Sequence, residues 1–361
     1  MKKLLALMLA LAMTFALAAC GSTPAASNNA ASTGSASGDK SVADADGKTY
    51  KVGIVNWVDH ASLNQIVENV EQELDAKAAE LGVTFDYADY YDNAQADQSV
   101  LSQIGANMIA DDVDIVVAIA TPSAAVMQSA LEDTDIPVVF SAITDPVIAG
   151  LVDSMDAPGG KVTGTSDALN TESIMNLIFA ADPDCDYVGL LYDTAQDSST
   201  QAIADAKAFL DAKGVKYIEK TSSTTGDVQL AAQALIAEGV DAVFTPTDNT
   251  IMDAELSIYE SFIEAGIPHY TGADSFALNG AFLGYGVDYA NLGRATADMV
   301  VDILVNGADP AETAVQTFDN GIATVNTETC AALNLDLDAL KTAFAPYCTE
   351  VQEITTAESF E

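Results

Sequence analysis

The amino-acid sequence predicts an α/β fold with two doubly wound parallel-sheet lobes joined by a three-stranded hinge. Short apolar runs rich in β-branched residues alternate with helical segments, which is typical of parallel sheets covered on both faces. The roughly 310 residues from Tyr50 onward exceed what one hydrophobic core usually serves. An internal repeat also divides most of these residues into two similar halves.

Residues 1–19 have the pattern of a lipoprotein signal peptide. Two lysines precede an apolar run from Leu4 to Ala19, and the segment Leu17-Ala18-Ala19-Cys20 resembles a bacterial lipobox. The run is shorter than the roughly 20 residues that span a bilayer, so we expect cleavage and acylation of Cys20, with an uncleaved anchor helix as the alternative. Residues 20–49 then form the lipidated cysteine and a flexible tether of small polar residues. The protein is expected outside the cytoplasm and in contact with the membrane only through its lipid.

The internal repeat begins with the strand pattern YKVGIVNW at residues 50–57 and starts again with YVGLLYD at residues 187–193. In each half a helical segment follows and ends in Gly-Val, at Gly82 and Gly214, an offset of 214 − 82 = 132. Later in each half an Ile-Pro pair opens a strand pattern, at Ile136 and Ile267, an offset of 267 − 136 = 131. Offsets that agree this closely predict two structurally equivalent lobes.

The segments after the second half complete the two lobes. AFLGYGVDYANLGRATADMVVDILVNGADP has the pattern of a further strand and helix, and VQTFDNGIATVN and LDLDALKTAFAPY follow it. We expect the N-terminal lobe to comprise residues 50–165 and 282–315, and the C-terminal lobe residues 166–281 and 316–361. The chain would then cross between the lobes through a hinge that permits closure around a ligand.

The expected binding site lies beyond the carboxyl ends of the strands, where parallel sheets bind ligands. Polar residues gather at these ends, where hydroxyls at helix N-termini suit a carboxylate and acidic side chains suit an ammonium group. Trp57 and Tyr192, which close the first strand of each half, suit an aromatic ring. The alternatives are helix caps for the polar residues and hinge packing for the two rings. The candidate ligand-binding residues are Trp57, His60, Thr121, Ser123, Ser141, Thr144, Asp145, Tyr192, Ser198, Ser199, Thr247, Asp248, Asn249, Asp274 and Ser275.

Composition and motifs exclude several classes of function. The formal net charge of −41 repels nucleic acid and anionic lipid. Arg294 is the only arginine in the sequence, so no multi-arginine clamp can hold a phosphate or a carboxylate. The sequence contains no G-x-S-x-G, H-E-x-x-H, Walker-type or G-x-G-x-x-G motif. We therefore expect neither catalysis nor a cofactor.

The numbers and positions of the cysteines and histidines limit which disulfides and metal sites are possible. Once Cys20 is assigned to the lipid, Cys185, Cys330 and Cys348 remain. Cys330 and Cys348 could close a disulfide in an oxidising compartment or stay free. The two histidines, His60 and His269, lie in no cluster with ligand spacing, so no metal site is expected.

Several segments together resemble a known family. They are VGIVNWVDHASL, VVAIATPSA, PVVFSAITDPVIAGLV, VTGTSD, GLLYD, PTDN and GYGVDYANLGRATADMVVDILVNGADP. The chain is similar in these to ABC-transporter substrate-binding lipoproteins associated with tryptophan and tyrosine uptake. The resemblance implies a type I periplasmic-binding-protein fold, an aromatic amino acid in the interlobe cleft, and delivery to a membrane permease driven by a cytoplasmic ATPase.

The residues alone leave other functions open. One is the binding of another small solute, such as a nucleoside, a sugar or a branched-chain amino acid. Another is a surface receptor or adhesin, whose mark would be an exposed apolar patch and a protein partner. A monomer is expected in either case.

Overall fold

The computed structural model describes residues 47–318 and 321–360. The predictions for residues 1–19, Cys20 and most of the tether lie outside this part of the chain. In the described part, no helix has the length and apolarity needed to cross a membrane.

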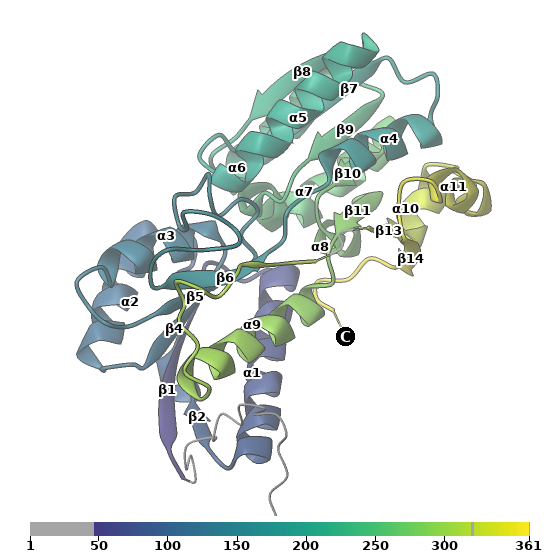
Figure 1. The fold of residues 1–361 in the computed structure, drawn as a ribbon. Helices are drawn as coiled ribbons and strands as arrows, with labels where there is room; N and C mark the ends of the chain where they lie inside the picture. The colour runs from purple at the N-terminus through teal and green to yellow at the C-terminus, as the bar shows by residue number, and fades with distance from the viewer. Residues whose placement is uncertain (1–46, 319–320, 361) are drawn as a thin grey trace, which may run out of the picture. The chain divides into compact units, whose positions relative to one another are not determined.

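The first lobe is a parallel sheet with helices on both faces (Figure 1). Its strand order is β12-β6-β5-β4-β1-β2, and β3 also pairs with β1. Helices α1 and α9 pack together on one face, and α2 and α3 pack together on the other. The strands are β1 (Thr49–Asn56), β2 (Thr84–Asp86), β3 (Tyr91–Asn93), β4 (Ile115–Ile119), β5 (Val138–Ser141), β6 (Val162–Ser166) and β12 (Gln316–Thr317). The helices are α1 (Ala61–Leu81), the 3₁₀ helix η1 (Ala88–Tyr90), α2 (Gln98–Ala110), α3 (Thr121–Ala130) and α9 (Tyr289–Leu304).

The second lobe has the strand order β14-β13-β11-β10-β9-β7-β8. Its strand pairs are parallel except for β11 with β13. The strands are β7 (Tyr187–Tyr192), β8 (Lys216–Thr221), β9 (Ala242–Thr245), β10 (His269–Thr271), β11 (Leu283–Gly286), β13 (Ile322–Asn326) and β14 (Glu350–Ile354). The helices are α4 (Thr171–Ala181), α5 (Asp197–Lys213), α6 (Thr225–Glu238), α7 (Asn249–Ala265), α8 (Asp274–Leu278), α10 (Thr327–Ala332) and α11 (Leu337–Phe344).

The predicted fold class is confirmed, and the internal repeat corresponds to equivalent elements of the two lobes. Strands β4 and β9 are buried along their whole length because helices cover both faces of each sheet. Gly82 ends α1 with φ 69°, and Gly214 ends α5 with φ 73°. A left-handed residue closes a helix most readily when it is glycine, so the repeated Gly-Val marks the same turn in both lobes.

The lobe boundaries differ from the prediction at β11 and β12. Residues 282–315 were expected in the first lobe, but β11 pairs with β10 and β13 in the second sheet. A side chain at Gly284 would place its Cβ 2.1 Å from the Ala273 carbonyl oxygen, so the glycine lets this strand pack directly against α8. Likewise β12, expected in the second lobe, pairs with β6 in the first.

The chain therefore passes between the lobes after β6, after β11 and after β12. The last of these crossings includes residues 319 and 320, which lie outside the described part.

The disulfide considered between Cys330 and Cys348 is wrong, because both are free thiols in the structure, as is Cys185. The Cys330 Sγ atom lies 3.6 Å from the Leu335 carbonyl oxygen, just beyond its own helix α10. The Cys348 Sγ atom lies 3.3 Å from the Phe344 carbonyl oxygen at the end of α11. Each thiol thus faces a carbonyl group of its own segment rather than the other thiol.

Candidate functional site

A small cavity lies between the lobes at the carboxyl ends of their strands, with a volume of about 30 Å³. Eight of the predicted candidates line it: His60, Thr121, Thr144, Ser198, Thr247, Asp248, Asn249 and Ser275. The lining also includes residues that the sequence analysis did not select: Ser62, Leu63, Ala120, Ala142, Asp167, Met252, Ala273, Phe276 and Tyr289. The wall therefore combines hydroxyl and amide groups with apolar and aromatic side chains.

Two of the residues that the sequence analysis missed, Ala120 and Ala142, follow β4 and β5 directly. Both have left-handed backbone conformations, with φ 71° and φ 58°. A residue other than glycine pays roughly 1–3 kcal/mol for such a conformation, and strain of this kind concentrates at ligand sites. Alanine carries no sequence signal for it, so only the backbone geometry reveals these positions.

Polar side chains join the two lobes across this cavity. The Ser62 hydroxyl donates to Ser275 Oγ at 2.6 Å, and Thr144 Oγ1 lies 3.0 Å from Thr247 Oγ1. In each pair one residue belongs to the first lobe and the other to the second. The lobes therefore meet through short neutral hydrogen bonds.

A third contact between the lobes joins His60 to Asn249, with His60 Nε2 2.9 Å from Asn249 Oδ1. The Asn249 amide nitrogen donates to Gln196 Oε1, so its oxygen faces the imidazole and Nε2 donates the proton. Burial lowers the pKa of His60 to about 4. The ring is therefore neutral at physiological pH, and its buried Nδ1 atom has no hydrogen-bond partner among the described residues.

Helix N-termini without side-chain caps converge on the cavity. Seven of the described α-helices have an N-cap side chain that accepts a backbone N–H bond, namely α2, α4, α6, α7, α9, α10 and α11. The four α-helices without one are α1, α3, α5 and α8, and each contributes a residue of its first turn to the cavity wall. Uncapped first turns leave N–H donors available, and these attract an anionic group.

The cavity wall includes two carboxylates with different surroundings. Asp248 caps α7 by accepting from the N–H groups of Thr250 and Ile251, and its Oδ2 accepts from Asp193 N and Ser199 Oγ, both at 2.7 Å. Burial raises the pKa of Asp248 to about 6. Through these hydrogen bonds Asp248 joins the loop after β7 and the start of α5 to the first turn of α7.

Asp167, the second carboxylate, lies at the first crossing between the lobes and is 5% exposed. Its Oδ1 accepts from the Thr144 hydroxyl and its Oδ2 from the Tyr289 hydroxyl, both at 3.1 Å. Burial raises the pKa of this carboxyl group, and the two hydroxyls oppose that shift. Asp167 ends the segment VTGTSD, which resembles the known family, and it directly follows β6, but the sequence analysis did not select it.

The two predicted aromatic contacts lie away from the cavity. Trp57 is 6% exposed and packs in the hydrophobic core of the first lobe. Tyr192 donates its hydroxyl to Glu219 Oε2 at 2.6 Å and does not line the cavity. The prediction of a Trp57–Tyr192 pair facing across the cleft is therefore wrong, and the aromatic side chains in the cavity wall are Phe276, Tyr289 and His60.

Five other predicted residues do not line the cavity. Ser123 and Ser141 are buried in the first lobe, Ser141 bonding to Thr296 Oγ1 at 2.9 Å. Asp145 accepts from the N–H groups of the two residues after Pro146 and so stabilises a turn. Ser199 donates to Asp248, and Asp274 opens α8. Ser141, Asp145 and Ser199 thus serve as local caps and core hydrogen bonds, which is the alternative that strand-end polar residues always carry. The Ser123 hydroxyl and Asp274 Oδ1 are buried and have no hydrogen-bond partner among the described residues.

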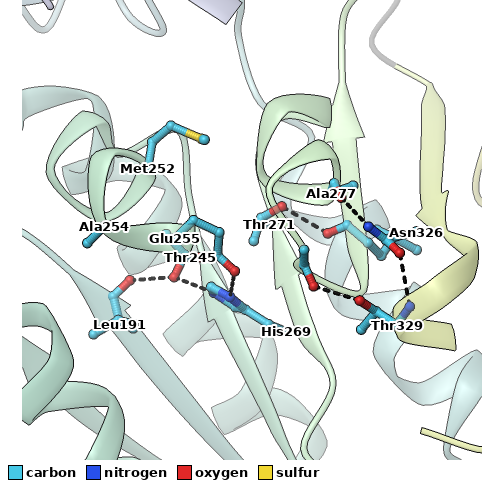
Figure 2. Close-up of polar contacts among 12 residues, drawn as sticks. Leu191, Thr245, Met252, Ala254, Glu255, His269, Thr271, Ala277, Asn326 and Thr329 are labelled. Carbon is cyan, nitrogen blue, oxygen red and sulfur yellow. Dashed lines mark hydrogen bonds and ion pairs between the residues drawn. The ribbon is translucent and has the colours of Figure 1, made fainter. Parts of the chain in front are cut away.

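Glu255 and His269 form a buried acid–base pair in the second lobe (Figure 2). Glu255 Oε1 lies 3.1 Å from His269 Nδ1, and His269 Nε2 lies 2.9 Å from Thr245 Oγ1. Because the Thr245 hydroxyl donates to the Leu191 carbonyl oxygen, it accepts from Nε2, and one proton is shared between Nδ1 and Glu255. The His269 ring packs edge-on against Phe276, so this pair supports a residue of the cavity wall.

The described residues contain no group of three or more His, Cys, Asp and Glu side chains placed to hold a metal ion. The cavity wall instead offers N–H donors, hydroxyls and two carboxylates. Asp248 accepts four hydrogen bonds from the protein, and Asp167 accepts fewer.

Comparison with known proteins identifies the family. The family of ABC transporter substrate binding proteins matches residues 51–343. The chain belongs to this family. A curated relative, a tyrosine-binding protein of Clostridioides difficile (strain R20291), is 29% identical over 290 residues, which cover 80% of this chain and 82% of the relative.

Solved structures of similar chains support the same assignment and a fold similar to type I periplasmic binding proteins. An ABC domain from Streptococcus pneumoniae in complex with L-Trp has a TM-score of 0.76 at 29% identity, covering 84% of this substrate-binding protein and 100% of that chain. A ligand-free, open substrate-binding protein with adhesive properties from Clostridium difficile has a TM-score of 0.64 at 27% identity, covering 85% and 100%. The arrangement described here is thus more similar to the Trp complex than to the open chain.

Proposed function

We propose that this substrate-binding protein captures an L-aromatic amino acid between its lobes and delivers it to a membrane permease driven by a cytoplasmic ATPase. The observation that carries the proposal is the convergence of four uncapped helix N-termini on a cavity that also holds a buried carboxylate. The N–H groups suit the ligand's carboxylate, and a carboxylate side chain suits its ammonium group. A zwitterion needs both.

The apolar part of the wall supports an aromatic side chain. Leu63, Met252, Phe276 and Tyr289 line the cavity together. Aromatic and thioether side chains pack favourably against an aromatic ring. Two relatives, each 29% identical to this chain, are described with tyrosine or L-Trp, which is consistent with a ligand of this class.

Entry of such a ligand requires the lobes to separate. A volume of about 30 Å³ has room for about two water molecules and is far too small for an amino acid. The contacts that hold the lobes together are the neutral pairs Ser62–Ser275, His60–Asn249 and Thr144–Thr247. We infer that binding opens these pairs and that the polar groups of the ligand then replace them.

The N-terminal pattern supports a lipid anchor. We propose that Cys20 is acylated and that the segment from Cys20 to Lys48 tethers the binding lobes outside the membrane, as a monomer. The tether expected up to residue 49 is one residue shorter, because Thr49 begins β1. This segment consists mainly of small and polar residues, which is the composition of a linker. Ligand capture and membrane attachment would then be independent of each other.

Isothermal titration calorimetry against the twenty amino acids, purine nucleosides and simple sugars tests the ligand class. The expected result is saturable binding of tryptophan, tyrosine or phenylalanine that is at least tenfold tighter than binding of leucine or isoleucine. Saturable binding confined to sugars or nucleosides would overturn the amino-acid proposal and leave the family assignment standing. Binding of a protein partner with no small-molecule binding would favour the adhesin alternative.

A further inference from the structure

Two acidic residues, Asp167 and Asp248, line the cavity, and the choice between them as the partner of a ligand's positive charge rests on the proposed amino-acid function. We propose that Asp167, on the first crossing between the lobes, binds the ligand's ammonium group and that Asp248 does not. The proposal makes Asp167 the residue that distinguishes amino acids from otherwise similar carboxylic acids.

The acceptor positions of Asp248 are already used within the protein. A carboxylate offers about four acceptor positions. Asp248 has four donors, from Thr250 N and Ile251 N on Oδ1 and from Asp193 N and Ser199 Oγ on Oδ2. An ammonium group could bind Asp248 only by displacing groups that build the loop and the helix start.

Asp167 has room for another donor. Its donors are the hydroxyls of Thr144 and Tyr289, one on each oxygen, and its own backbone N–H group, which is one donor fewer than Asp248 has. All three residues line the cavity, so the remaining acceptor positions lie at the edge of the space where a ligand would sit. Two hydroxyl donors also hold the carboxylate in a fixed orientation before the ligand arrives.

The charges of the cavity wall are unbalanced. The cavity wall carries two carboxylates, Asp167 and Asp248, and no lysine or arginine. His60 is its one imidazole, and this ring is neutral at physiological pH. Among the described residues no lysine, arginine or histidine forms an ion pair with Asp167. A buried carboxylate without a cation is costly, and a ligand ammonium group supplies that cation.

Asp167 also lies close to the crossings between the lobes. Thr144 bonds both to Asp167 and to Thr247 of the opposite lobe. Tyr289 begins α9 just after the second crossing. A cation held by Asp167 would therefore sit beside two of the three hinge crossings and close to the Thr144–Thr247 contact between the lobes.

The test compares amino acids with their deaminated analogues in calorimetry on the purified protein. The probes are phenylalanine with 3-phenylpropionate and tryptophan with indole-3-propionate. We expect the wild type to prefer the amino acid by 100-fold or more. Asp167→Asn should weaken amino-acid binding 30-fold or more and change binding of the deaminated analogue less than threefold. Asp145→Asn, at the neighbouring strand end but outside the cavity wall, is the matched control and should change neither.

Two results would overturn the proposal. One is an equal loss of both ligands in Asp167→Asn, which would show a general packing defect. The other is a wild type that binds the deaminated analogue as tightly as the amino acid, a measurement that needs no variant to fold. If the wild type binds only an aliphatic amino acid, the aromatic proposal fails while the same comparison, made with that amino acid and its deaminated analogue, still decides the role of Asp167. If it binds no amino acid, both fail.

Discussion

The carboxyl group of Asp274 should make the stability of this protein depend on pH. Its Oδ1 atom is buried and has no hydrogen-bond partner among the described residues. Burial, with a smaller contribution from the charge of Asp288, raises the pKa of Asp274 from 3.8 to about 7. A raised pKa means that the folded protein binds the proton more tightly than the unfolded chain does. The protonated Asp274 carboxyl group therefore contributes fully to the free energy of unfolding below pH 4. This contribution is lost as the pH rises through about 7.

The magnitude follows from the size of the pKa change. A rise of about three units corresponds to about 4 kcal/mol at about 1.4 kcal/mol per unit, and partial exposure of the residue reduces it, so we expect about 2–4 kcal/mol. Asp274→Asn keeps the shape and removes the charge. It should raise the free energy of unfolding by that amount at pH 8 and by at most about 1 kcal/mol at pH 4.5, where most of the contribution is still present.

Urea denaturation of the wild type and Asp274→Asn at both pH values measures this difference. Asp133→Asn, an exposed aspartate, controls for the general effect of removing one negative charge from a chain of net charge −41. If Asp274→Asn stabilised the protein equally at pH 4.5 and pH 8, the carboxyl group would not be desolvated in the way that its burial implies.

Four further expectations follow from the described contacts and the N-terminal pattern. Asp248→Ala should lower the free energy of unfolding by about 2–4 kcal/mol in urea denaturation, because it removes a helix cap and leaves two buried donors unpaired. Glu255→Ala and His269→Ala should each cost about 3–5 kcal/mol, and the double variant should cost less than their sum in a double-mutant cycle. Trp57→Ala should destabilise the first lobe by about 3–5 kcal/mol and, where the protein still folds, weaken aromatic and aliphatic ligands alike in calorimetry. Cys20→Ser should release the protein from the membrane fraction without changing ligand affinity, and continued fractionation with the membrane would contradict the lipid anchor.

The sequence predicted those parts of the fold that are determined locally. The glycines at 82 and 214 end equivalent helices because the left-handed turn after a helix is a property of a few residues. The lobe that receives β11 was not predictable in this way, since a buried strand carries the same apolar pattern in either sheet. The close packing of Gly284 against α8 places β11 in the second lobe, and that contact joins elements separated by a turn of the chain.

The candidate site was likewise predictable only where the position of a residue along its own strand and loop decides the outcome. Thr121, Thr247 and Asn249 reach the cavity because the segment that leads from a central parallel strand into the next helix lies at the ligand edge of the sheet. Trp57 and Tyr192 also follow this rule in position, but their side chains turn into the first-lobe core and toward Glu219. The direction of a strand-end side chain depends on neighbours from other elements, which the sequence of the strand alone does not specify.

The three neutral contacts between the lobes explain how such a site can open and close. Each hydrogen bond contributes roughly 0.5–1.5 kcal/mol net, because water replaces the partner when the lobes separate. Closure by these pairs alone is therefore worth only a few kcal/mol, and the entropy of the hinge opposes it. Hydrogen bonds to charged groups contribute about 1.5–3 kcal/mol each. A zwitterion that bonds to uncapped helix N-termini in both lobes and to a carboxylate at the hinge thus gains more than the pairs it displaces, and it shifts the lobes toward closure by that difference.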